Sequence, residues 1–206
     1  TSKLAKKFYQ TAILLPYLMS MVVVAYLVYA FLSTDTGLVN NSIIKGLLGR
    51  EEGISWYTEK VYWPFILTFV QQWKQIGFGM LLYLSSLLGI DQSYYEAAML
   101  DGASRWQQIR KITIPLLKPT IIMLVILNLG QVFRSDFGLF YQVPMNQGAL
   151  YSVTQTIDTY VYRALLVNNN LGMSSAASFL QSVVGFIFIV TANGIVRKMD
   201  KNSSLF

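Results

Sequence analysis

The chain has 206 residues, of which 54% are hydrophobic and 13% are charged, and its mean hydropathy of +0.46 is typical of a membrane protein. It contains no Cys and no His, which excludes a disulfide framework, a thiolate metal site, a Ser-His-Asp triad and a His-ligated zinc or haem. We therefore expect no metal site and no catalytic site. The net charge of +6 is arranged as a membrane orientation signal and does not indicate a nucleic-acid partner.

Four apolar stretches are long enough to cross a bilayer as helices, which takes about 20 residues. They cover about residues 8–32, 64–90, 121–140 and 171–196. The first stretch is too long for a cleavable signal and contains Pro16, where we expect it to bend. The fourth begins with small residues, which allow close helix packing in a membrane.

Two polar segments each join two consecutive apolar stretches, and both are expected on the same side of the membrane. Residues 33–62 are predicted to form a loop with short helical pieces. Three of its aromatic residues and the residue after it are suited to the membrane interface: Trp56, Tyr57, Tyr62 and Trp63. Residues 141–170 are predicted to form a second loop, with a helix over 153–167.

Basic residues predict the orientation of the chain. If both termini and residues 91–118 lie on one side, that side holds ten Lys and Arg: Lys3, Lys6, Lys7, Arg105, Arg110, Lys111, Lys118, Arg197, Lys198 and Lys201. The other side then holds four: Lys45, Arg50, Lys60 and Arg163. The positive-inside rule places the basic side in the cytoplasm, so the chain is expected to be a multi-pass protein of a bacterial-type cytoplasmic membrane.

Residues 91–118, between the second and third stretches, are too rich in charge for a bilayer core. Apolar residues recur there at spacings of three and four, which predicts one amphipathic helix with a single stripe: Met99, Ala103, Trp106, Ile109 and Ile112. Pro115 and Pro119 are expected to limit this helix. From spacing alone, docking on a soluble partner and lying on the lipid surface are equally supported.

The same segment carries a known motif. Glu96-Ala97-Ala98 is followed after three residues by Gly102, and nine residues later by Ile112-Thr113-Ile114-Pro115. This resembles the EAA signature (EAA, three residues, G, nine residues, I-x-L-P) of the permease subunits of binding-protein-dependent ABC importers, with Ile114 as its only departure. The longer run EAAMLDGASRWQQIRKITIPLLKP is similar to the carbohydrate branch, the maltose-, oligosaccharide- and polysaccharide-type permeases.

The resemblance implies an all-α transmembrane bundle of the type I ABC importer permease kind. Residues 1–206 would form a single permease domain, with about two further spans ahead of them. It also implies a set of residues that contact a cytoplasmic ATPase: Glu96, Ala97, Ala98, Asp101, Gly102, Ile112 and Pro115.

The implied assembly contains a second, different permease chain, two ATPase subunits and an extracytoplasmic solute-binding protein, within membrane lipid. ATP and Mg²⁺ would be bound by the ATPase, since this chain has no phosphate-binding GxxxxGK[ST] loop and is not expected to be an enzyme.

Polar residues inside the spans normally face a bundle interior or a water-filled path. We expect such a path for a sugar from Gln71, Gln72, Trp73, Lys74, Asn128, Gln131 and Arg134, with aromatic faces from Trp73, Phe133 and Phe137. The alternative is structural: the amides hold helices together, and the two cations extend to the interface.

Three other functions are compatible with parts of the pattern. A permease for amino acids, phosphate or another anion would use Lys74 and Arg134 as its anion site. A channel or a secondary transporter would work without an ATPase. A membrane enzyme is disfavoured because His, Cys and paired carboxylates on one predicted face are absent from the sequence.

Overall fold

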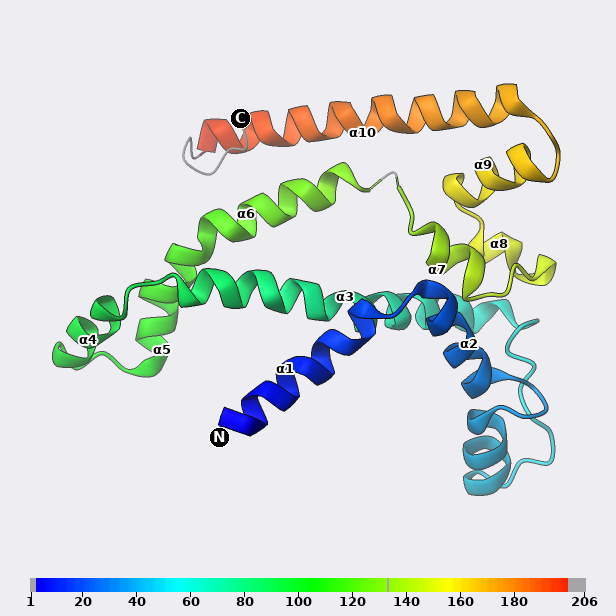
Figure 1. Ribbon diagram of the computed structural model, residues 1–206, viewed down its shortest axis with the longest axis horizontal. Helices are drawn as coiled ribbons and strands as arrows, with labels where there is room; N and C mark the ends of the chain where they lie inside the picture. The colour runs from blue at the N-terminus through cyan, green and yellow to red at the C-terminus, as the bar shows by residue number, and fades with distance from the viewer. Residues whose placement is uncertain (1–2, 133, 200–206) are drawn as a thin grey trace. The chain divides into compact units, whose positions relative to one another are not determined.

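The computed structural model describes residues 3–132 and 134–199, and every regular element in these ranges is helical, as expected (Figure 1). Phe133 and Lys201 lie outside the described residues, as do the side chains of Lys3 and Lys6. The chain divides into two compact units. The first comprises residues 1–77 and 134–179, and the second comprises residues 78–133 and 180–206.

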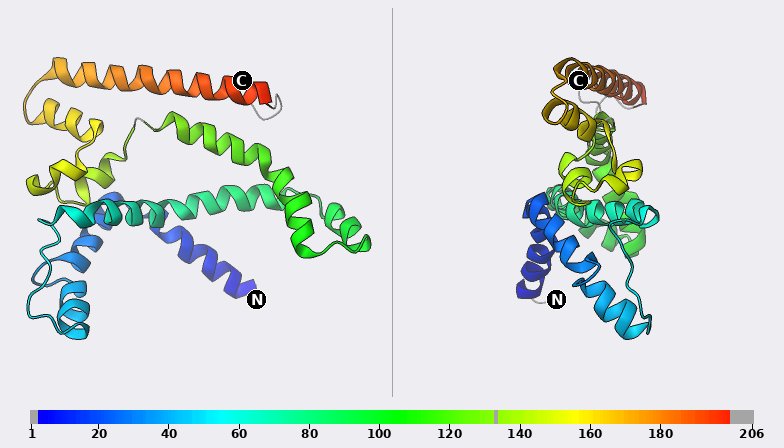
Figure 2. Two further views of the ribbon diagram at one scale, coloured as in Figure 1. Left: turned by 180° about the vertical axis from the view of Figure 1, so that it is seen from behind. Right: turned by 90° about the vertical axis from the view of Figure 1, so that its right-hand side faces the viewer.

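The first unit begins with a sharply bent pair of helices. Helix α1 (Lys3–Leu18) and helix α2 (Met21–Leu32) meet at an angle of 99° (Figure 2). Pro16 is buried just before the bend, which confirms the expected position of the bend. Ser20 then starts α2, because its hydroxyl accepts the Val23 N–H at 3.3 Å.

The loop after α2 is held by one buried amide. It contains the π-helix η1 (Val39–Leu47) and the 3₁₀-helix η2 (Lys60–Tyr62), the short helical pieces that were expected. Asn40 is 0% exposed. Its Oδ1 accepts from the Ile54 N–H and from Trp56 Nε1, each at 3.0 Å, and its Nδ2 donates to the Ile54 carbonyl at 2.9 Å. These bonds tie both halves of the loop together.

The core of the first unit lies where α2, α3 (Trp63–Leu88) and α7 (Phe137–Gln142) pack with η4 (Gly148–Leu150). Its buried members are Val24, Ala25, Trp63, Leu67, Val70, Leu139, Val143 and Leu150. Trp63 is 0% exposed, so its ring packs within this core, and its expected depth at the membrane interface stays a prediction. Trp63 is the first buried residue of α3, and its Nε1 donates to the Trp56 carbonyl at 2.7 Å.

The rest of this unit contains α8 (Tyr151–Thr154), α9 (Ile157–Leu166) and the first part of α10 (Leu171–Met199). The single helix expected over 153–167 is two helices. Thr156 separates them because its hydroxyl accepts the Thr159 N–H at 3.3 Å in a capping box.

The second unit contains the last part of α3, the helices α4 (Gln92–Leu100) and α5 (Arg105–Gln108), the π-helix η3 (Ile109–Thr113), α6 (Ile114–Gly130) and the last part of α10. Within this unit α4 and α5 form the turn between the end of α3 and the start of α6 (Figure 1). The hydroxyls of Ser86 and Thr120 share a hydrogen bond of 3.0 Å, which joins α3 to α6.

The helices match the expected spans only in part. Two described helical runs, Arg105–Leu129 and Leu171–Lys198, are long and apolar enough to cross a membrane, and the bent α1–α2 pair makes three if it counts as one span. The four expected spans are therefore more than these helices show. Helix α3 covers residues 63–88 without meeting that test, because the polar run at 71–75 interrupts its apolar sequence.

The third span also ends earlier than expected. Helix α6 stops at Gly130, and residues 137–142 form the separate helix α7. Gly is a poor helix former, and the Gln131 N–H already turns back to the Asn128 carbonyl at 3.0 Å.

Candidate functional site

The segment between α3 and α6 is broken into two helices. Gly102 adopts a left-handed backbone with φ of +74° after α4, and the Ala103 N–H donates to the Ala98 carbonyl at 2.9 Å. Ser104 then caps α5 in a box with Gln107. The expected single helix with one apolar stripe is therefore wrong, because Gly102 ends α4 and turns the chain before Trp106.

The proline residues do not end the segment as expected. The π-helix η3 passes directly into α6, and Pro115 lies in the first turn of α6, where its missing N–H costs little. Pro119 is accommodated inside the helix. The run from Arg105 to Leu129 is thus continuous, and a displacement of α5 would be carried into α6.

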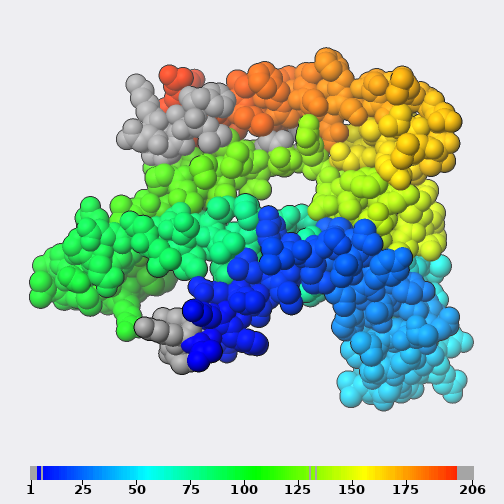
Figure 3. Space-filling model, viewed as in Figure 1, coloured from blue at the N-terminus to red at the C-terminus, as the bar shows by residue number. Residues whose placement is uncertain are grey.

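Helix α4 has no buried residue. Leu100 is 90% exposed, and Glu96, Ala97 and Met99 are also exposed. In Figure 3 this green segment forms the surface at its end of the second unit. Met99 and Leu100 are thus open to a partner or to lipid.

The open surface continues around the break. A Cβ added to Gly102 would meet nothing within 4 Å. Asp101 and Pro115 are exposed, and Ile112 is half-buried. Trp106 on α5 is 69% exposed. Gly102 is therefore favoured by its left-handed backbone, and not by a close neighbour among the described residues.

Two contacts fix the position of α4. The hydroxyls of Tyr95 and Thr113 share a hydrogen bond of 2.9 Å, which links α4 to η3. Asp91 caps α4 by accepting the Ser93 N–H at 2.9 Å. Hydrogen bonds from the Ser93 backbone and side chain hold the pKa of Asp91 below its ordinary value.

The consecutive path candidates on α3 point in different directions, because successive helical residues are about 100° apart. Gln72 is exposed, and Gln71 is half-buried. Gln71 Oε1 is inaccessible to solvent and accepts no hydrogen bond from the described residues. It is therefore a buried acceptor without a donor among these residues.

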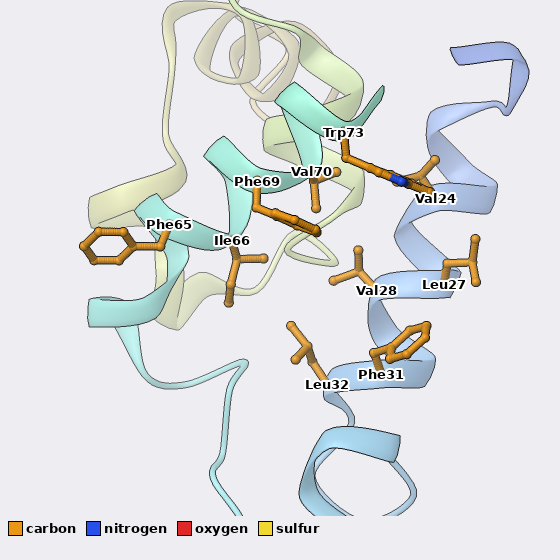
Figure 4. A pocket seen from close by; sticks show the side chains of 10 residues that line it. All are labelled: Val24, Leu27, Val28, Phe31, Leu32, Phe65, Ile66, Phe69, Val70 and Trp73. Carbon is orange, nitrogen blue, oxygen red and sulfur yellow. The ribbon is translucent and has the colours of Figure 1, made fainter. Parts of the chain in front are cut away.

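Trp73 lines an apolar groove between α2 and α3 (Figure 4). The groove encloses about 630 Å³, and all of its lining residues are apolar: Val24, Leu27, Val28, Phe31, Leu32, Phe65, Ile66, Phe69, Val70 and Trp73. Trp73 was expected beside polar groups, and the structure places it among hydrocarbon side chains.

Lys74 reaches the bend between α1 and α2. Its Nζ donates to the Tyr17 carbonyl at 3.0 Å and to the Met19 carbonyl at 2.7 Å, and it lies 5.7 Å from the centre of the Tyr17 ring. The bend frees these carbonyls, since they lie where one helix stops and the next starts. This geometry supports the structural interpretation of Lys74 and does not favour an anion site there.

The remaining path candidates are divided between the units. Asn128 and Gln131 belong to the second unit, Arg134 belongs to the first, and all three are exposed. Phe137 is half-buried in the first unit, where it packs against Tyr141 and Tyr162. No single unit gathers the whole expected path.

The structure buries or clusters several polar side chains that the sequence analysis did not single out. On α10, Gln181 and Asn193 are 6% and 3% exposed, and a polar residue in an apolar span is the signal that could have found them. In the first unit, α7 to α9 bring together a group that we term the tyrosine–arginine cluster: Tyr141, Asn146, Tyr151, Tyr162 and Arg163. Among the residues described, no three His, Cys, Asp or Glu gather as a metal site would need.

Comparison with known proteins gives consistent matches over nearly the whole chain. The family described as "Binding-protein-dependent transport system inner membrane component" matches residues 1–201. Protein LplB of Bacillus subtilis (strain 168) is 35% identical over 196 residues, covering 95% of this chain and 60% of its own. The polygalacturonan/rhamnogalacturonan transport system permease protein YteP of the same strain is 34% identical and likewise covered over 60% of its length. The chain thus spans about three fifths of these relatives.

A solved structure shares the fold. In the crystal structure of a bacterial alginate ABC transporter with an alginate pentasaccharide-bound periplasmic protein, one chain aligns with a TM-score of 0.87 and 33% identity. The alignment covers 98% of this chain and 68% of that one.

Proposed function

Because the chain belongs to the family of inner membrane components of binding-protein-dependent transport systems, we propose that it is a permease subunit of an ATP-driven importer for a carbohydrate. Similarity to YteP and to the alginate transporter, whose names specify polysaccharides, supports this class of solute. The EAA-like motif at Glu96–Gly102 supports the assignment as a permease subunit, and the longer run to Pro119 resembles the carbohydrate branch.

The exposed helix α4 is the single observation that carries the proposal. Its proposed role is to dock on a separate cytoplasmic ATPase through Glu96, Ala97, Ala98, Asp101 and Gly102, with Ile112 and Pro115 following in η3 and α6. Closure of the ATPase would displace α4. The Tyr95–Thr113 bond and the continuous run from α5 into α6 supply a rigid connection to the span.

The proposed assembly has a second permease chain, two ATPase subunits that bind ATP and Mg²⁺, and an external solute-binding protein. The proposed orientation follows from charge and takes α3 as a fourth crossing: the termini and α4 face the cytoplasm, and residues 33–62 and 141–170 face outwards. This chain would then hydrolyse no ATP and act only through the movement of its helices.

For the solute path we retain Gln71, whose Oε1 has no donor among the described residues. Because that atom is closed to solvent, a sugar hydroxyl would reach it only after the helices move. Four other polar residues remain candidates for the path because each is exposed on its own unit: Gln72, Asn128, Gln131 and Arg134. Trp73 and Lys74 are weaker candidates, because one lines the apolar groove and the other caps the α1–α2 bend.

The test is ATP-driven saccharide uptake by the full-length permease, reconstituted with its partner subunits in proteoliposomes. We expect Glu96→Lys to abolish uptake while the permease still inserts, because it reverses the charge on the docking surface. Gln92→Lys, an exposed change on the same helix, is the control and should retain uptake. Uptake that needs no ATPase, or that survives Glu96→Lys, would overturn the coupling role.

A further inference from the structure

The tyrosine–arginine cluster is organised by a tight turn after α7. Val143 and Pro144 are fully buried, and the next two residues, Met145 and Asn146, have left-handed φ values of +52° and +47°. Asn tolerates this conformation, whereas Met adopts it only at an energetic cost. The turn places Asn146 Oδ1 3.0 Å from the Tyr151 hydroxyl and 3.1 Å from Arg163 Nη1, and both groups donate to it.

Arg163 on α9 is the cation of the cluster. Its Nη2 donates to Thr159 Oγ1 at 3.2 Å, and its Cζ lies 4.2 Å from the centre of the Tyr151 ring. Over the residues that the structure describes, Arg163 forms no ion pair, and two of its nitrogens make these two bonds. A guanidinium carries five N–H donors, so the half-buried group keeps donors and a charge for which the described residues supply no further acceptor or carboxylate.

Aromatic faces adjoin this charge. The rings of Phe137 and Tyr141 are stacked at 4.9 Å with an interplanar angle of 18°, and the Tyr162 ring lies 4.7 Å from the first and 4.9 Å from the second. Burial and then the neighbouring Tyr162 raise the pKa of Tyr141, while Arg163 opposes the rise. Arg163 thus acts electrostatically on the Tyr141 hydroxyl, and the Tyr141 ring adjoins that of Tyr162.

This combination matches one ligand chemistry. Aromatic faces and hydroxyl or amide groups recognise sugar rings, and a guanidinium with free donors binds a carboxylate in a bidentate manner. A neutral sugar would leave the charge unpaired. We propose that Tyr141, Tyr162 and Arg163 form an external contact site for the uronate rings of an acidic oligosaccharide. This inference rests on the proposed function and on the outward orientation of residues 141–170.

The test compares two probes of equal size, an oligogalacturonate and its neutral methyl ester, in ATP-driven uptake by the full-length assembly. Arg163→Gln retains hydrogen-bonding capacity and removes the charge. We expect it to lower uptake of the acid about tenfold, while uptake of the ester changes by less than about twofold. Tyr141→Phe and Tyr162→Phe, which keep the rings, should lower uptake of both probes by a smaller factor.

The outcomes separate this inference from the proposed function. Equal losses of acid and ester uptake, or no loss of either, would leave the ratio of the two unchanged and overturn the site, because Arg163 would then act only through the structure or through another partner. If Arg163→Gln does not assemble, Arg163→Lys replaces it, because an ammonium cannot make the bidentate contact; an unchanged ratio again overturns the site. Import of the ester but not of the acid by the unmodified assembly contradicts only the inference, whereas failure to import any saccharide with ATP contradicts the proposed function.

Discussion

The side chain of Lys74 on α3 donates to the main-chain carbonyl of Met19 at 2.7 Å, across the bend that separates α1 from α2. One turn further along α3, the backbones of α3 and α1 approach each other closely, because a Cβ on Gly77 would lie 2.6 Å from the Ile13 carbonyl oxygen. A cation at the end of α1 also suits the negative end of its dipole. Lys74 and Gly77 together hold α1 against α3.

We predict that Lys74→Met destabilises the first unit by about 2–4 kcal/mol, because two carbonyls at the bend lose a charged donor. The measurement is the thermal midpoint of the purified full-length permease in detergent. Gln75→Met, an exposed change at the next position, is the control and should leave the midpoint nearly unchanged. Equal midpoints for Lys74→Met and the unmodified protein would show that the bend does not depend on this bond.

The buried amide of Asn40 yields a second prediction. Asn40→Ala should destabilise the 33–62 loop by about 2–4 kcal/mol, because the Ile54 amide and the Trp56 indole lose their acceptor in a buried setting. The rate of limited proteolysis within 33–62 measures this effect. Asn41 is exposed and bonds only the Asp35 carbonyl among the described residues. The Asn41→Ala variant should therefore be cleaved as slowly as the unmodified protein. Similar cleavage rates for Asn40→Ala and Asn41→Ala would count against the role of Asn40.

Gly102 and Gly49 form a matched pair. Both have positive φ, +74° and +64°, and neither would bring an added Cβ within 4 Å of another atom. Asn tolerates such a backbone, so Gly102→Asn and Gly49→Asn should cost similar stability. If the surface at Gly102 docks on an ATPase, only Gly102→Asn should lower ATP-driven uptake, by about tenfold for a loss of about 1.4 kcal/mol. Equal uptake by the two variants would mean that nothing approaches Gly102.

The cap on α4 predicts a dependence on pH. The pKa of Asp91 is lowered in the folded state, so its contribution to stability is present above the ordinary Asp pKa of about 4 and is lost as pH falls through the lower folded value. We measure the protection of the α4 amides from hydrogen exchange, corrected for intrinsic rates. This protection should fall as the pH is lowered from about 4 through the folded-state pKa of Asp91. Asp91→Asn keeps an acceptor that does not titrate, so protection of α4 in this variant should not change with pH. If protection declines equally in the variant and in the unmodified protein, a group other than Asp91 causes the decline.

The sequence predicted the helices best where apolar periodicity and breakers agree. Pro16 indicated the α1–α2 bend, and the apolar run at 171–196 corresponds to α10. The segment 91–118 was predicted less well. Its spacing fits one helix, but Gly102 adopts the left-handed turn at little cost because it has no Cβ, and the π-helix η3 leads into α6 just before Pro115.

The candidate sites divide in the same way. The motif Glu96–Gly102 could be identified because it is local in sequence, and α4 presents it on an open surface. The role of Lys74 depends on carbonyls 55 and 57 residues away, and the Arg163 contacts depend on the left-handed turn at Asn146. Such contacts require the tertiary structure, since neither partner is fixed by periodicity.

The central claim, that α4 docks on a separate ATP-hydrolysing subunit, is tested most directly by site-specific cross-linking. The chain has no Cys, so Leu100→Cys, at a position 90% exposed on α4, can carry a thiol-attached photo-cross-linker in the full-length assembly. We predict a covalent product with the ATPase subunit whose yield changes when ATP is added, and no such product from Leu47→Cys, at a position 81% exposed in η1. Cross-links from Leu100→Cys to lipid alone would contradict the account.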